Sequence, residues 1–234
     1  MKFLVFQHIA HESPGMIADW AKERAVRLDV VRLWEFGYSI PDLAAYDALV
    51  IMGGPMGVYE AYPSRNAEVA AIRSIVGKKP LIGFCLGSQL LAFALGAKVY
   101  PNMRDGKKVK EIGYCNVELT DAGAQDPLLE SFTSPMTVLQ WHGDAFDLPS
   151  GAILLATSKD CPNQAFLSGG NAYGFLFHFE FTSEMVTWQI EIDRAWIHDG
   201  FELDETALLR QANENAVLMR QQCFQLMDSF LNLV

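Results

Sequence analysis

The stretch Leu81-Ile-Gly-Phe-Cys-Leu-Gly-Ser-Gln89 decides the fold of this chain. It begins as a short apolar run, typical of a buried strand, and passes without a linker into a helical pattern. Gly83 and Gly87 flank Cys85 at equal spacing, and a sharp turn there would bring backbone against backbone, leaving no room for a Cβ. The spacing is that of the G-x-S-x-G nucleophile elbow with sulfur in place of oxygen, and it predicts a strand, a tight turn carrying Cys85 and a helix.

Cys85 is therefore predicted to be a nucleophile. A lone cysteine in an apolar run is usually an inert part of the core, but the flanking glycines and the following helix favour the reactive alternative. The free N–H groups and the dipole at the start of the helix favour a thiolate, so we expect a lowered pKa for the Cys85 thiol. The N–H of Leu86 would then point toward an oxyanion formed when the sulfur attacks an acyl group.

Short apolar runs alternate with helical patterns throughout the first half of the chain. Strands are expected at 3–6, 30–33, 48–52 and 81–84, and helices at 15–27, 65–76 and 88–95. This alternation is typical of βαβ units, in which helices cover both faces of a parallel sheet. The predicted fold class is α/β, with a doubly wound, mostly parallel sheet and helices on both faces.

The second half adds further strands and then helices. Strand-like pieces at 113–119, 136–140, 153–157, 163–167 and 173–177 are expected to join the same sheet, partly antiparallel, because no Pro/Gly/Ser-rich linker precedes them. Residues 182–234 are predicted to be a helical extension, with a helix stop at Gly200 and apolar side chains at helical spacing in Met185, Trp188, Ile192 and Trp196. We expect residues 1–234 to form a single domain on which the last helix packs; a partner-binding face is the alternative for that helix.

The composition excludes several partners and sites. Lys plus Arg number 18 against 28 Asp plus Glu, and the net charge of −10 repels nucleic acid and anionic lipid. The beginning of the chain lacks a signal-peptide core and the apolar stretch 81–99 carries three glycines and a lysine, so we expect no membrane span and a cytoplasmic protein. The four cysteines form no C-x-x-C pair, which argues against a metal site and a disulfide framework.

Two further motifs complete a candidate site. Glu180 follows His178 by two residues at the end of an apolar run, so on a strand both side chains project from one face and the carboxylate can orient the imidazole. Gly53 and Gly54 follow another predicted strand, where bare backbone N–H groups can approach a ligand closely.

Other polar features have plainer interpretations. His8 and His11 follow the first strand and are expected to be ordinary surface histidines, with a place near the mouth of the site as the alternative. His142 is either a structural histidine bonded to the backbone or a pocket residue. The charged segment 104–111 is expected to be a solvated loop, with a lip over the active site as the alternative.

Taken together, these motifs resemble the class I glutamine amidotransferases, the family with a Cys-His-Glu triad. The resemblance rests on Gly53-Gly54-Pro55, on Gly83-Phe-Cys85-Leu-Gly87-Ser-Gln89 and on His178-Phe-Glu180, which stand in the family's order. It spans roughly residues 45–185. In addition, Gln140-Trp-His-Gly-Asp144 looks like the Ser-His-Gly-Asp stretch that lines the glutamine pocket in the GMP synthetase branch. The resemblance implies a flavodoxin-like α/β fold.

The resemblance also implies roles for individual residues. Cys85 would attack the side-chain amide of glutamine or of another γ-glutamyl compound, His178 would pass a proton to the leaving ammonia, and Glu180 would orient His178. Gly54 and Leu86 would supply the oxyanion N–H groups. The residues implied to bind the substrate are Gly53, Gln89, His142 and Gly143. No metal or organic cofactor is implied, because thiol chemistry with His and Glu needs none.

The sequence departs from the family in two ways. Phe179 stands where the family commonly has proline, which predicts a less constrained local backbone. No synthetase domain fits into 234 residues, and Ser168-Gly-Gly-Asn171 does not match the ATP-pyrophosphatase loop. Either a separate synthetase subunit takes the ammonia, or the chain is a stand-alone hydrolase of glutamine or other γ-glutamyl amides. A non-catalytic binding module on this fold and a related α/β cysteine hydrolase with its acid and histidine elsewhere are the remaining alternatives.

Overall fold

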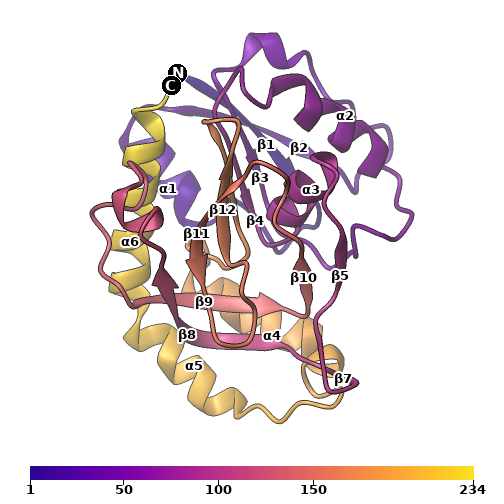
Figure 1. Cartoon of the computed structure of the whole chain (residues 1–234), viewed down its shortest axis with the longest axis vertical. Coiled ribbons are helices and arrows are strands. Elements are labelled where there is room, and N and C mark those ends of the chain that lie inside the picture. The colour runs from indigo at the N-terminus through magenta and orange to yellow at the C-terminus, as the bar shows by residue number, and fades with distance from the viewer.

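The computed structural model describes residues 1–234 and is built around a nine-stranded sheet with the strand order β2-β1-β3-β4-β13-β12-β11-β8-β9 (Figure 1). One half of the sheet is parallel: β1 (Lys2–Gln7), β2 (Arg27–Arg32), β3 (Ala48–Ile51), β4 (Leu81–Phe84) and β13 (Ala172–Phe175). The other half is antiparallel: β8 (Glu111–Leu119), β9 (Met136–His142), β11 (Ile153–Thr157) and β12 (Ala165–Ser168). The sheet is therefore mixed, in agreement with the prediction that the strands of the second half join it partly antiparallel.

Two small ladders and six helices complete the chain. The ladders pair β5 (Val99–Pro101) with β10 (Asp144–Phe146), and β6 (Met103–Arg104) with β7 (Lys107–Lys108). The helices are α1 (Met16–Glu23), α2 (Arg65–Ile75), α3 (Leu86–Ala94), α4 (Ser183–Ile197), α5 (Glu205–Glu214) and α6 (Ala216–Leu231). Short 3₁₀ turns lie at Leu43–Ala45 and Gly123–Gln125.

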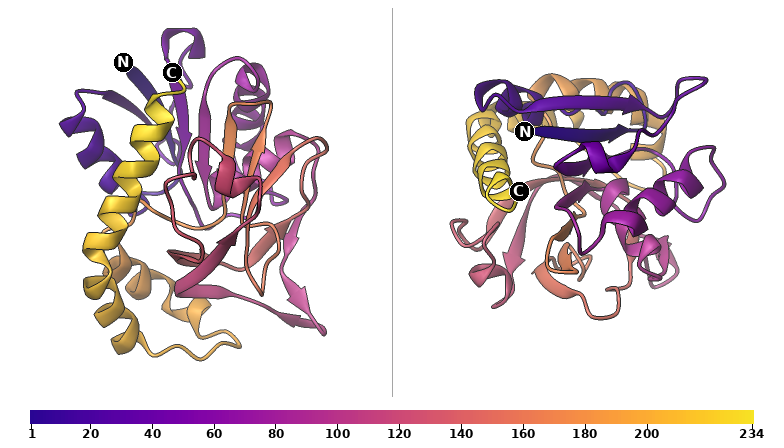
Figure 2. Two further views of the ribbon diagram at one scale, coloured as in Figure 1. Left: turned by 60° about the vertical axis from the view of Figure 1, so that its left-hand side comes forward. Right: turned by 90° about the horizontal axis from the view of Figure 1, so that it is seen from above.

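Helices cover both faces of the sheet because the side chains of each buried strand alternate between the faces. On β1, Phe3 and Val5 pack in one core with α1 and α6, whereas Leu4 and Phe6 pack in a second core with α2 and α3. A third core joins α4 and α5 to β8 and β9. Figures 1 and 2 show α6 lying along α1, with the two termini close together. The predicted α/β fold is confirmed, and the last helix packs on the sheet as expected.

Several predicted boundaries are wrong by a few residues. The helix expected at 15–27 ends at Glu23, because Ala25 takes a left-handed φ of 54° and Arg27 pairs with Lys2 at the start of β2. The strand expected at 173–177 ends at Phe175. The segment 104–111 is not a simple loop: β6 and β7 form a hairpin whose turn places Asp105 and Gly106 at positive φ.

The C-terminal helices also differ from the prediction. Trp188 and Ile192 share the spacing of the buried Met185, yet they are 50% and 54% exposed. The face that α4 buries is instead carried by Val186, Gln189 and Ile190 beside Met185. Gly200 lies beyond the end of α4 with a φ of 71°, as expected for a helix stop. No helix in the chain is both long enough and apolar enough to cross a membrane.

The tight packing of the Cys85 turn predicts that one methyl group added at Gly83 lowers the stability of the fold. A Cβ on Gly83 would lie 2.6 Å from the backbone C and O atoms of Gly87, which cannot move aside without displacing α3. We expect Gly83→Ala to lower the free energy of unfolding by about 2 to 3 kcal/mol in urea titrations, the range of overpacked cores. Gly57→Ala is the matched control, because its Cβ would meet the half-exposed ring of Tyr59 instead of backbone. Equal losses in the two variants would contradict the elbow packing.

Candidate active site

Cys85 occupies the turn between β4 and α3 in a strained backbone conformation. Its φ of 48° and ψ of −108° lie outside the regions that side chains normally adopt. The N–H of Cys85 donates to the Phe175 carbonyl of β13 at 2.8 Å, and the turn is closed by Ser88, whose N–H donates to the Cys85 carbonyl at 3.0 Å. These bonds hold the sulfur at the N-terminus of α3, as the glycine spacing predicts.

The expected low pKa of the Cys85 thiol is wrong. Cys85 is only 7% exposed, and its thiol donates to the Trp141 carbonyl at 3.7 Å. Burial raises the pKa of the thiol; the neighbouring His178 lowers it by hydrogen bonding and charge, without compensating for the loss of water. Burial thus favours the protonated thiol, and a base beside it is needed to make the sulfur a nucleophile.

His178 and Glu180 form a buried pair next to this thiol. His178 Nδ1 donates to Glu180 Oε1 at 2.7 Å, and both side chains are at most 1% exposed. The pair does not lie on a strand, since β13 has ended at Phe175; instead the His178 N–H donates to the Leu139 carbonyl of β9 at 2.8 Å in an isolated bridge. The predicted pairing is present, although a bend and a contact with β9 produce it.

The charge on Glu180 controls the protonation of His178. Burial is the largest single influence and lowers the pKa of His178, but the attraction of Glu180 and hydrogen bonds with Cys85 and Glu180 together outweigh it. The pKa of His178 is thus held well above its ordinary value. An imidazole of this kind can take a proton from the thiol and remain stable as a cation.

Phe179, which stands where the family commonly has proline, is firmly held. Its N–H donates to Glu180 Oε2 at 3.0 Å, a bond that proline could not make. Its ring packs edge-on against Phe177 and Phe175, with centroids 5.2 and 5.9 Å away. The expectation of a less constrained backbone is therefore wrong for this position.

Gly54 and Leu86 lie next to each other beside the sulfur. A Cβ on Gly54 would be 2.8 Å from Leu86 Cδ2, so only glycine allows this approach. Neither a backbone carbonyl nor a side chain accepts a hydrogen bond from the Gly54 N–H. The N–H of Leu86 belongs to the first turn of α3, where the helix itself offers no acceptor. Both N–H groups are thus free of acceptors, Gly54 lines the pocket beside Cys85, and Leu86 directly follows Cys85.

His8 is a buried residue, which corrects the expectation of a surface histidine. It is 2% exposed and lies between two oxygen atoms: its Nδ1 is 2.9 Å from the Gly53 carbonyl and its Nε2 is 2.7 Å from Glu68 Oε2. His11 is partly exposed and does not line the pocket.

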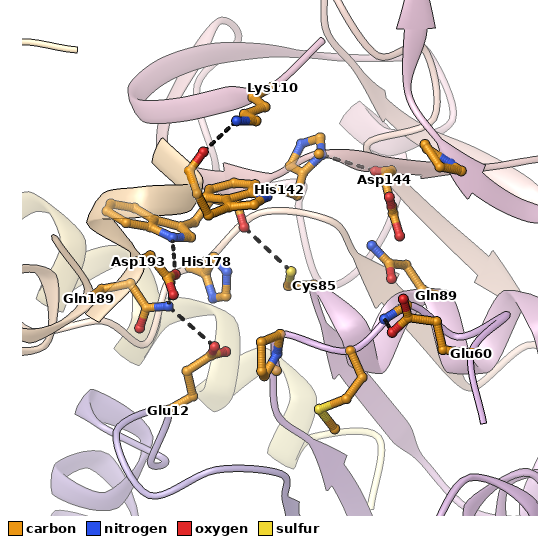
Figure 3. Close-up of a pocket in the computed structure, with 18 of the residues that line it drawn as sticks. Glu12, Glu60, Cys85, Gln89, Lys110, His142, Asp144, His178, Gln189 and Asp193 are labelled. Carbon is orange, nitrogen blue, oxygen red and sulfur yellow. Dashed lines mark hydrogen bonds between the residues drawn. The ribbon is translucent and has the colours of Figure 1, made fainter. Parts of the chain in front are cut away.

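A pocket of about 300 Å³ opens over the sulfur (Figure 3). It gathers most of the predicted residues on its wall: Gly54, Cys85, Gln89, His142, Gly143 and His178. Gly53, Leu86 and Glu180 lie behind that wall. Gln89 makes no side-chain hydrogen bond within the chain, and Figure 3 shows it across Cys85 from His178. The β6–β7 hairpin contributes Lys108, so the segment 104–111 also forms a lip of the pocket.

His142 combines its two predicted interpretations. Its Nδ1 donates to the Asp144 carbonyl at 3.1 Å, as a structural histidine would, and its Nε2 lies 3.1 Å from Glu111 Oε2 without hydrogen-bond alignment. At the same time the ring lines the pocket beside Gly143, whose carbonyl accepts from Asn102 N–H at 2.8 Å.

One side of the pocket carries Glu12, Gln189 and Asp193, which were not predicted from the sequence. Gln189 Nε2 donates to Asp193 Oδ2 at 2.7 Å and to Glu12 Oε1 at 3.4 Å (Figure 3). Gln189, Asp193 and Trp196 share one face of α4, a spacing that is visible in the sequence. Glu12 follows the carboxyl end of β1, the sheet edge at which Gly53 and Cys85 also lie, so its position was also a usable signal. The described residues contain no group of three or more His, Cys, Asp or Glu side chains arranged to hold a metal ion.

The contact between His178 and Glu180 predicts that the pKa of His178 changes when the Glu180 carboxylate is removed. In Glu180→Gln the attraction disappears while burial remains, so the pKa of His178 should fall. Titration of the ring resonances of His178 by NMR measures this shift. Glu111→Gln, which removes a buried carboxylate beside His142 instead, is the control and should leave the pKa of His178 unchanged. An unaltered His178 titration in Glu180→Gln would show that another group sets its protonation.

Glu12 predicts a pH-dependent cost to folding. Burial raises its pKa from 4.5 to about 7. Between these values the unfolded chain has released a proton that the folded chain keeps, so this residue lowers the free energy of unfolding as the pH rises. Relative to Glu12→Gln, the wild type should lose about 3 kcal/mol between about pH 4 and pH 8 in urea titrations. Glu191→Gln, on the exposed surface of α4, controls for removal of a carboxylate. Parallel curves for the wild type and Glu12→Gln would contradict this account.

Comparisons with known proteins identify the family of this chain. A family model described as glutamine amidotransferase class-I matches residues 15–190. YfeJ of Salmonella typhimurium, a glutamine amidotransferase-like protein, is 35% identical over 199 residues, covering 82% of this chain and 81% of that protein. The glutamine-hydrolysing GMP synthase of Porphyromonas gingivalis is 35% identical over 141 residues, covering 59% of this chain and 26% of its own length. The chain thus spans about a quarter of that relative.

Two more similarities extend the comparison. The gamma-glutamyl-L-1-hydroxyisopropylamide hydrolase of a Pseudomonas species is 28% identical over 163 residues, covering 68% of this chain and 55% of that protein. The crystal structure of a glutamine amidotransferase from Thermotoga maritima superposes with a TM-score of 0.88 at 31% identity, covering 99% of this chain and 98% of that one. With a family model across most of its length and a relative matched over four fifths of it, the chain belongs to the class-I glutamine amidotransferase family.

Proposed function

We propose that this chain hydrolyses the side-chain amide of glutamine, or of another γ-glutamyl compound, through a γ-glutamyl thioester on Cys85. The observation that carries the proposal is the meeting of the Cys85 thiol with the His178–Glu180 pair in one pocket. The N–H groups of Gly54 and Leu86, which have no acceptor within the chain, support it, because acyl transfer needs donors for the developing oxyanion.

The first half of the reaction forms the thioester. His178 takes the proton of the Cys85 thiol, and the sulfur attacks the γ-carbonyl carbon while the carbonyl electrons move onto oxygen. The N–H groups of Gly54 and Leu86 stabilise that oxyanion. When the tetrahedral intermediate collapses, the C–N bond breaks and His178 returns its proton to the leaving nitrogen, which departs as ammonia or as an amine.

The second half regenerates the enzyme. His178 removes a proton from water as the water oxygen attacks the thioester carbon, and the C–S bond breaks to release glutamate. The sulfur recovers the proton from His178. Glu180 keeps its charge throughout and stabilises the imidazolium each time it forms. Because burial raises the pKa of the Cys85 thiol, the reaction depends on this proton transfer to His178.

The remaining pocket residues are assigned to substrate binding. Gln89 has a free amide on the side of Cys85 away from His178, which suits the α-substituents of the glutamyl group. His142 and Gly143 lie on the same wall of the pocket, and Gly53 supports it from behind. The leaving nitrogen would then lie on the His178 side, next to Glu12 and Gln189.

Two fates of the released nitrogen are supported by different relatives. The glutamine-hydrolysing GMP synthase is about four times as long as its match to this chain, which supports delivery of ammonia to a separate synthetase subunit. The Pseudomonas hydrolase acts, by its name, on a γ-glutamyl alkylamide, which supports a stand-alone hydrolase. The identity with the GMP synthase is the higher of the two, so glutamine is our first choice of substrate.

The test is release of glutamate and ammonia by the purified chain, with glutamine and a panel of γ-glutamyl alkylamides as substrates. Cys85→Ala should reduce kcat by about 10⁴-fold or more, because loss of the nucleophile removes the thioester route. Cys115→Ala is the matched control: that thiol lies on β8 and does not line the pocket. Mass spectrometry should detect a glutamyl adduct on Cys85 in the wild type.

The outcomes separate the alternatives. Turnover of glutamine supports an amidotransferase subunit, and turnover only of alkylamides supports the stand-alone hydrolase. Full activity of Cys85→Ala would refute the mechanism. A wild type that forms no adduct with any γ-glutamyl compound or with thiol-directed glutamine analogues would favour a non-catalytic binding module.

A further inference from the structure

A second buried pair of an imidazole and a carboxyl group lies next to the Gly53–Gly54 turn, and the proposed reaction does not use it. It joins His8, at the end of β1, to Glu68, in the first turn of α2. The two side chains are fully buried and their Nε2 and Oε2 atoms are 2.7 Å apart. On its other edge, His8 Nδ1 lies 2.9 Å from the Gly53 carbonyl oxygen. Thus one imidazole connects a carboxylate to the backbone of the glycine turn.

The partners of His8 determine which of its nitrogens carries hydrogen. The Gly53 carbonyl can only accept a hydrogen bond, so His8 Nδ1 must be the donor. This holds whether the proton shared with Glu68 rests on the imidazole or on the carboxyl group. Burial lowers the pKa of His8 most strongly, but hydrogen bonding and charge from Glu68, aided by the Gly53 carbonyl and Glu12, raise it overall. Proximity to Glu68 thus favours the protonated form of His8.

The bond to the Gly53 carbonyl fixes the orientation of the next N–H. In a trans peptide the C=O and N–H groups point in opposite directions. With its C=O turned toward His8, the Gly53–Gly54 peptide presents the Gly54 N–H to the opposite side. That N–H has no acceptor in the chain, and Gly54 lines the pocket beside Cys85 and Leu86.

Such a peptide needs an external constraint. Neither Gly53 nor Gly54 has a Cβ, so rotation of the peptide between them meets little steric resistance. A rotated peptide would turn the carbonyl oxygen toward the developing oxyanion and repel it. A hydrogen bond from a charged donor opposes that rotation more strongly than one from a neutral donor.

We propose that His8, backed by Glu68, is a positioning residue that holds the Gly53–Gly54 peptide with its Gly54 N–H directed at the oxyanion. The inference rests on the proposed function, since it assigns a purpose to a donor of that reaction. His8 touches neither the substrate nor the sulfur. It acts through its hydrogen bond to the Gly53 carbonyl.

The kinetic test compares two replacements of His8. His8→Leu removes the donor, whereas His8→Asn places an amide N–H near the position of Nδ1. We expect His8→Leu to lower kcat by about 10- to 100-fold with little change in KM, because the oxyanion donor acts only in the transition state. His8→Asn should recover a large part of kcat. The matched control is His198→Leu, which removes an imidazole 2.9 Å from Glu205 on the surface and should leave kcat unchanged.

A second measurement stands apart from catalysis and from the folding of variants. ¹⁵N NMR of the wild type, with histidine labelled in the ring, reports whether each nitrogen carries hydrogen. We expect both nitrogens of His8 to be protonated at neutral pH, and Glu68→Gln to remove the proton from Nε2 or weaken its retention. A wild-type His8 whose Nδ1 lacks hydrogen would overturn the inference even if His8→Leu failed to fold.

The outcomes also distinguish this inference from the proposed function. A wild type that turns over γ-glutamyl substrates, together with a folded His8→Leu variant of unchanged kcat, would refute the positioning role alone. An equal loss of kcat in His8→Leu and His8→Asn would likewise refute it, because the restored donor would then be without effect. A wild type that is inert toward all γ-glutamyl compounds would refute the proposed function, while the ¹⁵N measurement would still decide how His8 is bonded to Gly53.

Discussion

The rest of the site depends on one constraint, the close contact of the backbones of β3, β4 and α3 around the turn that carries Cys85. Gly83 of β4 faces the carbonyl of Gly87 in α3, and Gly87 in turn faces the carbonyl of Ile51 in β3, where a Cβ would lie only 2.3 Å away. Such close contact lets α3 begin directly above β4. Because Cys85 alone separates the strand from the helix, it takes a positive φ, and its side chain lines the pocket.

The parallel half of the sheet then gathers the remaining groups. Carboxyl ends of parallel strands meet at one edge, so the segments that follow β1, β3, β4 and β13 converge although they are far apart in the sequence. They bring His8, Gly54, Cys85 and His178 around one space. The antiparallel half has a supporting role: β9 holds His178 through the Leu139 carbonyl and covers the sulfur with that of Trp141.

Burial governs the electrostatics of this edge. Two imidazoles, His178 and His8, are each paired with a carboxylate that shares their burial, Glu180 and Glu68, and the pKa of each imidazole is raised. For Cys85 and Glu12, burial outweighs the attraction of the nearby imidazoles, so the pKa values of these two groups are raised as well. Burial and pairing therefore act together to set the proton affinities at this edge of the sheet.

The sequence by itself determined the features that neighbouring residues control. The glycines around Cys85 dictated the turn and the alternation of apolar runs dictated the α/β fold. The spacing of His178 and Glu180 predicted their pairing, although a bend and a contact with β9 produce it. Only the tertiary structure decided what depends on remote segments. Glu68 meets His8 across sixty positions, and the depth at which Cys85 is buried reverses the direction of its pKa. The difference is physical: backbone geometry is set by adjacent residues, whereas burial and long-range pairing depend on which strand ends the completed sheet brings together.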